Sequence, residues 1–200
     1  MEKYNIFTLF FLALLALFSL AEASSSSSSV ASSKATITYT NFIKTKCSTA
    51  TNSLVCLQTL YPFAATIQTS NLKLCTTALE AAINGTKNAS TTVTKLANQK
   101  QLSSMDVAAL KDCLSDSKDA VSELKHTISA LQHLKGPDRD FQWANAKTWG
   151  SAALSYAESC RDGFSVKKRV TPAVRQKIDS SFAKIEKLMS ISLFFINHLY

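Results

Sequence analysis

Two cysteines lie at equal distances from a single helix-breaking dipeptide. Cys113 lies 23 residues before Gly136, and Cys160 lies 23 residues after Pro137. Glycine is favoured just past a helix end and proline cannot continue a helix, so the dipeptide predicts a turn between two helices. In antiparallel helices joined by a tight turn, residues equidistant from the turn face each other. The spacing therefore predicts a disulfide between Cys113 and Cys160 that fastens two long helices together.

The chain has five cysteines, so two disulfides leave one thiol over. Cys47 and Cys56 are close in sequence and suit a local disulfide. Cys75 fits neither pair, because the residue expected to face it, Thr127, lies 14 residues, or roughly 21 Å along a helix, from Cys113. We therefore expect Cys75 to be a free thiol on an apolar helix face, where it behaves as a small hydrophobe and not as a nucleophile.

Residues 1–23 have the pattern of a secretory signal peptide. A positive start at Lys3, an apolar run and a small-x-small cleavage site ending at Ala23 follow one another. A retained signal anchor is the alternative. Residues 24–35 are rich in serine and predict a mobile leader, so a single folded domain is expected over residues 36–200. Secretion would place the cysteines in an oxidising environment, where they pair.

Apolar residues recur at alternating steps of three and four along four long segments that follow a shorter, interrupted region. Such steps predict helices packed along a common seam, and short connections make neighbouring helices antiparallel. We therefore predict an all-α fold with two disulfides: an antiparallel up-down-up-down four-helix bundle over about 66–200, preceded by a helical hairpin over about 36–65. The seam positions predicted for the four helices are, in order, Leu72, Cys75, Leu79, Ala82, Thr86, Ala89, Val93 and Leu96; Val107, Leu110, Leu114, Ser117, Val121, Leu124, Ile128 and Leu131; Phe141, Trp149, Ala152, Ala153, Tyr156 and Cys160; and Val174, Ile178, Phe182, Ile185, Leu188, Ser192 and Phe195.

Polar residues mark the expected starts of the later helices. Ser103 or Ser104 can cap the second long helix, with an acidic residue in its first turn. Asp138 can cap the third. Thr171, followed by Pro172 at the first helical position, is typical of the start of the fourth.

The residue types needed for catalysis or metal binding do not form a recognisable set. His126 and His133 lie about 10 Å apart along one helix, which is too far to share a metal. Glu123 lies one turn before His126, but two ligands do not make a metal site, so a solvated helix face is favoured. The sequence also has no glycine-rich phosphate loop. We therefore predict neither catalysis nor a metal nor any other cofactor.

The charge and the sequons point to an extracellular setting. The formal net charge is +8 at pH 7, which predicts retention by a polyanion such as an acidic wall polysaccharide. No basic stripe interleaved with aromatic residues is present, so nucleic-acid binding is not expected. Membrane binding is not expected either, because the apolar run within residues 1–23 is too short and wrongly flanked for an anchor. Asn84 and Asn88 each begin a glycosylation sequon, and both fall outside the predicted seam, so their glycans could project to solvent. The alternative is that neither sequon is used.

Three segments have residue spacings that are specific when taken together. They are Ile43-x3-Cys47 followed by Cys56-Leu57-Gln58-Thr59-Leu60-Tyr61-Pro62, then Ala109-Leu110-x2-Cys113-x7-Val121-x2-Leu124, then Asn145-x2-Thr148-Trp149-x-Ser151-Ala152-Ala153-Leu154-x5-Cys160-x-Asp162-Gly163-Phe164. In this order they resemble the hairpin, second-helix and third-helix motifs of the plant invertase and pectin methylesterase inhibitor family. The resemblance runs over nearly all of the chain after the signal peptide.

The resemblance implies a four-helix bundle with an N-terminal helical hairpin and the disulfides Cys47–Cys56 and Cys113–Cys160. It also implies a secreted, non-enzymatic protein of the apoplast and cell wall that forms a 1:1 complex with a wall enzyme and occludes its substrate cleft. Pectin methylesterase is the expected target. The alternatives are acid invertase of the wall or vacuole, and a basic structural wall protein with no enzyme target. The same bundle precedes many methylesterases as a pro-region, but the chain stops at Tyr200, directly after the fourth helix, which favours a stand-alone inhibitor.

The family resemblance also suggests where an enzyme would dock. It implies that the second, third and fourth long helices supply much of the docking face. The polar residues beside Cys160, Glu158 and Ser159, are the candidate contacts, and ordinary solvated helix surface is the alternative. The basic charge is expected to retain the protein on pectin and to steer it toward acidic surfaces.

Two positions depart from the family pattern. Gly150 stands where the family usually has a larger apolar residue, and this is expected to loosen the packing beside Trp149. The run Leu188–Ile196 is more aromatic than the usual ending of the family. Neither departure touches a cysteine, so the predicted fold is unaffected.

Overall fold

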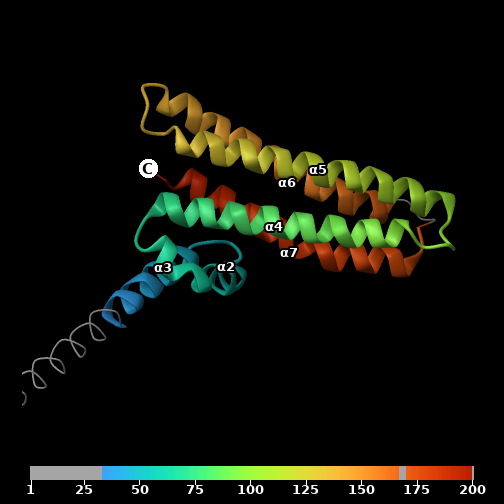
Figure 1. Cartoon of the computed structure of the whole chain (residues 1–200), viewed down its shortest axis with the longest axis horizontal. Helices are drawn as coiled ribbons and strands as arrows, with labels where there is room; N and C mark the ends of the chain where they lie inside the picture. Colours follow the sequence, from blue (N-terminus) through green and yellow to red (C-terminus); the bar gives the residue numbers. More distant parts are fainter. Residues whose placement is uncertain (1–32, 167–169, 200) are drawn as a thin grey trace, which may run out of the picture.

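The computed structural model describes residues 33–166 and 170–199, and within those ranges the regular structure is helical and contains no strand (Figure 1). Residues 33–48 form a first helical segment. Three short elements follow: α2 (Ser53–Leu60), the 3-10 helix η1 (Tyr61–Phe63) and α3 (Ala64–Ile67). Four long helices complete the chain: α4 (Asn71–Ala97), α5 (Ser104–Gln132), α6 (Arg139–Val166) and α7 (Pro172–Asn197). The predicted signal peptide lies outside the described residues.

The four long helices form one antiparallel bundle, as predicted. Each packs against the next along the chain, and α7 returns to pack against α4, which closes the bundle. Figure 1 shows α5 and α6 side by side along one edge and α4 and α7 along the other. The first helical segment and α2 lie at the end of the bundle where α4 begins, and α2 contacts both α4 and α7. The predicted all-α bundle with an N-terminal helical hairpin is therefore confirmed.

The structure contains both disulfides. Cys47 joins the first helical segment to α2 through Cys56. Cys113 of α5 joins Cys160 of α6, with their Cα atoms 4.3 Å apart. Cys75 is the free cysteine of the described residues and is completely buried, and burial raises the pKa of its thiol. Its buried, uncharged thiol therefore packs as a small apolar group.

The predicted seams of α4 and α7 match the buried faces of these helices. All seven seam positions of α7, from Val174 to Phe195, are buried. Seven of the eight seam positions of α4 are buried, and Leu72, in its first turn, is partly buried. Large aliphatic and aromatic side chains make up most of the buried face of α7, and in α4 Leu79, Val93 and Leu96 keep the same spacing among smaller residues, which is why three-four periodicity identifies both helices.

The predicted seams of α5 and α6 are wrong at two positions. Val107 is 49% exposed and Phe141 is 65% exposed. The reason is that the buried faces of these two helices mix small and large side chains, so the periodicity of large apolar residues marks them less clearly. The buried positions include the small or polar residues Asp106, Ala109, Ala120, Ala146, Ala153 and Ala157 beside the large Leu110, Leu124, Leu131 and Phe164. Small residues let two helix backbones approach closely, as the short Cα distance between the bridged cysteines requires.

A buried carboxylate joins the starts of α5 and α7. Ser103 is the N-cap of α5 and forms a reciprocal capping box with Asp106, each side chain accepting from the backbone N–H of the other residue at 3.1 Å. Thr171, the N-cap of α7, donates its backbone N–H and its hydroxyl to the same carboxylate, at 2.9 and 2.8 Å. Burial alone would raise the pKa of Asp106, but these hydrogen bonds outweigh it and lower the pKa.

The expected loosening of the packing around Gly150 is wrong. Gly150 is buried, and a Cβ atom placed there would lie 3.0 Å from Leu193 Cδ2 and 3.5 Å from Ile196 Cδ1 of α7. The larger side chains at the end of α7 therefore occupy the volume that a bigger residue in α6 would need.

Candidate functional site

Glu158 and Ser159 lie on α6 directly before Cys160, which the disulfide joins to Cys113 of α5. Glu158 and Ser159 are exposed on α6, and the next residue, Cys160, is buried and bridged to α5. At this point α6 is therefore joined to α5 by a covalent bond.

On the α5 side, Ser159 hydrogen-bonds the carboxyl group of Asp116. Burial raises the pKa of Asp116 most, the hydrogen bond from Ser159 opposes this rise, and the negative charges of Asp112 and Asp119 add to it. The net result is a raised pKa. Ser159 is thus not an isolated surface hydroxyl, since it joins α6 to a group of aspartates on α5.

On the α7 side, Glu186 pairs with Arg161 of α6, with 2.7 Å between Oε2 and Nη1. The side chain of Glu186 is only 12% exposed, and its Oε1 has no hydrogen-bond partner in the described part of the chain. Burial raises its pKa most, Arg161 offsets part of the rise, and neighbouring negative charges add to it. Those neighbours are Glu158, Asp162 and Asp179.

Carboxylates of α5 lie on one side of Glu158 and Ser159, and carboxylates of α7 lie on the other. We call them the acidic face, which consists of Asp112, Asp116, Asp119, Glu158, Asp162, Asp179 and Glu186. Arg161 lies among these carboxylates and pairs with Glu186, and the seven carboxylates leave the face negative although the formal net charge of the chain is +8. Exposed charges are screened beyond a Debye length of about 10 Å, so a partner near Glu158 experiences mainly these carboxylates. The expected steering toward an acidic surface therefore does not apply at this face, which suits cationic groups.

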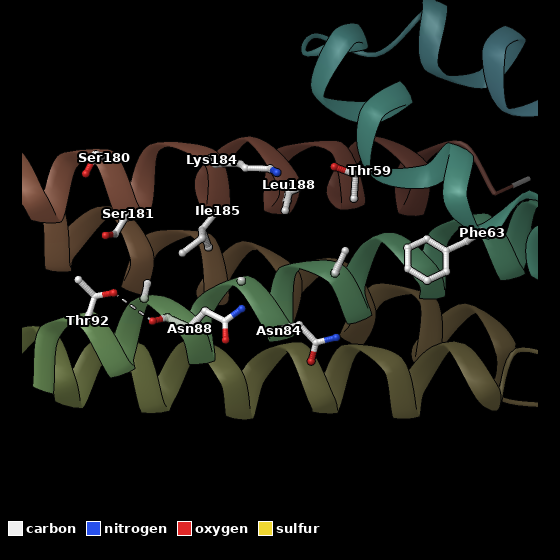
Figure 2. Close-up of a pocket in the computed structure, with 13 residues that line it drawn as sticks. Thr59, Phe63, Asn84, Asn88, Thr92, Ser180, Ser181, Lys184, Ile185 and Leu188 are labelled. Carbon is white, nitrogen blue, oxygen red and sulfur yellow. Dashed lines mark hydrogen bonds between the residues drawn. The ribbon is translucent and has the colours of Figure 1, made fainter. Parts of the chain in front are cut away.

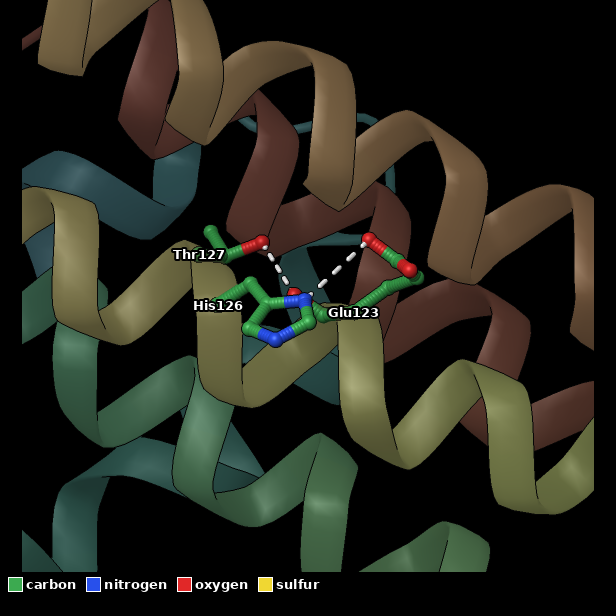
Figure 3. Close-up of polar contacts among 3 residues, drawn as sticks. All are labelled: Glu123, His126 and Thr127. Carbon is green, nitrogen blue, oxygen red and sulfur yellow. Dashed lines mark hydrogen bonds and ion pairs between the residues drawn. The ribbon is translucent and has the colours of Figure 1, made fainter.

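The predicted solvated face around His126 has more internal contacts than the sequence suggests. His126 Nδ1 lies 3.7 Å from a carboxylate oxygen of Glu123 (Figure 3). The ring of His126 also lies 5.4 Å from that of Trp149 on α6. The side chain is nevertheless 55% exposed. His133 lies about two helical turns after His126, at the C-cap of α5, where its Nδ1 contacts the carbonyl oxygen of Ser129. Among the described residues, no three His, Cys, Asp or Glu side chains are grouped closely enough to hold a metal.

Asn84 and Asn88 are exposed on α4, at the edge of a groove of about 520 Å³ between α4 and α7. Figure 2 shows both amides on the α4 edge, with Ser181 and Lys184 on the α7 edge and Phe63 at one end. Within the bundle α4 packs against α5 and α7, so this groove lies away from the exposed side of α6 that carries Glu158.

Sequence reasoning missed the acidic face and the link from Asp106 to Thr171. The α5 part of the face has a visible signal, because Asp112, Asp116 and Asp119 follow steps of four and three along one flank of a helix. The contribution of α7 has no such signal, because it depends on which flank of α7 lies beside α6. None of the described helices is long and apolar enough to cross a membrane.

Comparison with known proteins finds one family that spans most of the chain. The model of the plant invertase/pectin methylesterase inhibitor family matches residues 41–194. Pectinesterase inhibitor 4 of Arabidopsis thaliana is 36% identical over 163 residues, which cover 80% of this chain and 81% of that protein. A 21 kDa protein of Daucus carota is 32% identical over 160 residues, or 78% and 82% of the two chains.

The fold is also similar to a solved structure. The crystal structure of a mutant form of a pectin methylesterase inhibitor from Arabidopsis aligns with a TM-score of 0.60 at 19% sequence identity. The alignment covers 77% of this chain and 94% of that one. At this identity the likeness supports the bundle architecture alone.

Proposed function

Because this chain belongs to the plant invertase/pectin methylesterase inhibitor family, we propose that it is an inhibitor of pectin methylesterase and not itself an enzyme. The observation that carries this proposal is the family match over residues 41–194, together with relatives that are named pectinesterase inhibitors. Inhibition would be non-covalent, in a 1:1 complex that occludes the substrate cleft of the enzyme.

The acidic face is the part of the surface that we assign to docking on the enzyme. It spans α5, α6 and α7, and Glu158 and Ser159 lie at its centre. The disulfide beneath it and the hydrogen bond between Ser159 and Asp116 hold its side chains in position. Little ordering entropy is then lost when the face binds, which favours affinity. Its carboxylates would pair with arginine or lysine side chains at the rim of the cleft.

We further propose that the protein is secreted to the apoplast and cell wall. Two disulfides support this setting, since disulfides form and persist in oxidising compartments. The signal-peptide pattern of residues 1–23 agrees with it. Asn84 and Asn88 are exposed and would carry N-glycans on the α4 edge of the bundle, away from the acidic face. The basic net charge would help to retain the protein on pectin.

A titration against two enzymes tests the function. Purified protein is added in increasing amounts to a plant pectin methylesterase and, separately, to a plant acid invertase at acidic pH. We expect methylesterase activity to fall to its minimum near one equivalent of the protein while invertase activity is unchanged. Loss of invertase activity instead would assign the protein to the other branch of its family, and no effect on either enzyme would leave a structural wall protein.

A pair of charge reversals tests the docking face. Glu158→Lys should weaken inhibition by about tenfold, which corresponds to about 1.4 kcal/mol, because it places a cation where the enzyme would present one. Glu80→Lys is the matched control, since Glu80 is an exposed carboxylate on α4 and the substitution changes the net charge equally. Equal effects of both variants would show that net charge, and not this face, governs the inhibition.

A further inference from the structure

A second groove, between α4 and α5, is lined by three lysines. It has a volume of about 430 Å³, and its walls include Lys87 and Ser90 of α4 and Lys118, Ser122 and Lys125 of α5. Within the described residues, none of these three ammonium groups lies within 4 Å of a carboxylate oxygen. The groove therefore presents cationic charge that the chain itself does not neutralise.

The lysines of α5 form a regular row. Lys111, Lys118 and Lys125 are exposed and separated by seven residues each, so they follow one flank of the helix at intervals of about 10 Å. Lys118 and Lys125 line the groove toward α4, and Lys87 faces them from α4 itself. We call Lys87, Lys111, Lys118 and Lys125 the lysine row. Such a row matches an extended anionic chain better than a single small anion.

The two flanks of α5 carry opposite charge. Lys111 and Lys118 are each followed directly by an aspartate, but consecutive residues point about 100° apart on a helix. Asp112 and Asp119 influence Asp116, which bonds to Ser159 of α6, so these aspartates belong to the α6 flank. The lysine row therefore lies on the α4 flank, and the acidic face lies on the other.

The walls of the groove indicate the kind of anion it fits. Val121 is the apolar residue of its lining, and the rest are lysines and serines, which can hydrogen-bond hydroxyl groups as well as carboxylates. No aromatic side chain lines it, so it offers no platform on which nucleic-acid bases could stack. A polymer with regularly repeated carboxylates could pair with the lysines, and its hydroxyl groups could hydrogen-bond the serines.

We propose that the lysine row and its groove bind an acidic polysaccharide, a chain of uronic acid units with free carboxylates. The identity of the polymer rests on the proposed function, because removal of methyl esters from pectin leaves this kind of chain as the product. The inhibitor would then be held at sites where the enzyme has already acted. Since the two surfaces occupy opposite flanks of α5, the protein can bind the polymer and the enzyme at the same time.

Two triple variants of equal charge test the proposal. The groove variant is Lys87→Gln, Lys118→Gln and Lys125→Gln, and the control variant changes Lys44, Lys135 and Lys177, all exposed, to Gln. Binding to polygalacturonate is measured by titration calorimetry at low and at moderate salt. We expect the native protein to bind, more weakly at higher salt, and the groove variant to lose at least about fivefold in affinity. The control variant should lose less than about twofold.

The remaining outcomes overturn the proposal. Equal losses in the two variants would assign binding to net charge, and equal binding to fully methyl-esterified pectin would remove the role of carboxylates. Circular dichroism and the methylesterase titration verify that both variants are folded and inhibit normally. Because inhibition is measured separately, a protein that inhibits the enzyme but does not bind polygalacturonate refutes only this inference.

Discussion

The α4–α7 pair and the α5–α6 pair are both antiparallel, but different side chains hold them together. In the first pair, α7 buries mostly large side chains, among them Ile178, Phe182 and Met189. In the second pair, α6 buries mainly small residues around the Cys113–Cys160 disulfide, with Phe164 as a large exception. The first pair therefore relies more on large buried side chains, and the second adds a covalent bond between its helices. The acidic face lies mainly on the second pair, where the covalent bond keeps the exposed side chains in register.

The largest expected effect separates a buried phenylalanine of α7 from an exposed one at the start of α6. Phe182 of α7 is completely buried, so Phe182→Ala should lower the free energy of unfolding by about 4–5 kcal/mol. Phe141 of α6 is mostly exposed, so Phe141→Ala should cost less than about 0.5 kcal/mol. Guanidinium unfolding with the disulfides intact measures both values. Similar losses in the two variants would mean that the start of α6 is packed as the sequence periodicity predicts.

Removing the disulfide tests what holds the second pair. Replacing Cys113 and Cys160 by Ala opens a link between residues 47 apart in sequence, and the entropy of a loop of this length is worth about 4 kcal/mol. Replacing Cys47 and Cys56, which are 9 residues apart, should cost about 2.5 kcal/mol.

Thermal unfolding of the two double variants, monitored by circular dichroism, compares these values directly. If loss of Cys47–Cys56 destabilised the protein more than loss of Cys113–Cys160, the packing of the hairpin would matter more for stability than the length of the loop that each disulfide closes. If the variant without Cys113–Cys160 lost almost no stability, side-chain packing alone would hold α5 against α6.

These differences explain which parts of the structure the sequence could predict. The bundle, its direction of packing and the Cys113–Cys160 pair follow from turn position and periodicity, which are local properties of the chain. The seam of α7 was predictable because large apolar residues mark it. The start of the seam of α5 was not predictable, because periodicity favours the apolar Val107 over the charged Asp106. In the structure Asp106 is the buried residue and Val107 is exposed. A carboxylate is buried there only because Thr171, 65 residues away, supplies two hydrogen bonds.

The candidate site could be predicted only in part for the same reason. Glu158 and Ser159 were identified by their position beside Cys160, and the aspartates of α5 have a visible spacing. That Glu186 of α7 is drawn into the same face depends on its pairing with Arg161 across the bundle. Such a contact is set by tertiary packing and leaves no periodic signal in the sequence.

Asp106 connects the two pairs, and its replacement should have the next largest effect. Asp106→Asn removes the charge that accepts from Ser103 and Thr171, at a cost of about 2–3 kcal/mol at neutral pH. Because the folded-state pKa is lowered below the usual 3.8, this stabilisation is complete above that value and is lost as the pH falls through the folded pKa. The difference between the native protein and the variant should therefore be constant near neutrality and shrink below about pH 4.

The control for this measurement is Asp140→Asn in the first turn of α6. The Asp140 side chain is 83% exposed, and its Oδ1 lies 3.1 Å from Nε of the neighbouring Arg139. The loss of unfolding free energy should therefore stay below about 1 kcal/mol. Urea unfolding at a series of pH values gives both curves. A difference for Asp106→Asn that does not change between neutral and strongly acidic pH would show that the hydrogen-bonded charge is not what stabilises the junction.

The smallest expected effect concerns the two glycines of α6. Gly150 faces α7, whereas a Cβ atom at Gly163 would point into open space. A Cβ atom at Gly163 would meet nothing within 4 Å, so Gly163→Ala should raise the free energy of unfolding by about 0.5–1 kcal/mol through helix propensity alone. The same substitution at Gly150 gains the same propensity but presses against Leu193 at 3.0 Å, so its net effect should be zero or destabilising. Differential scanning calorimetry of the two variants resolves the sign. Equal stabilisation by both would mean that Leu193 moves aside freely, and that close packing against α7 does not restrict the residue at position 150.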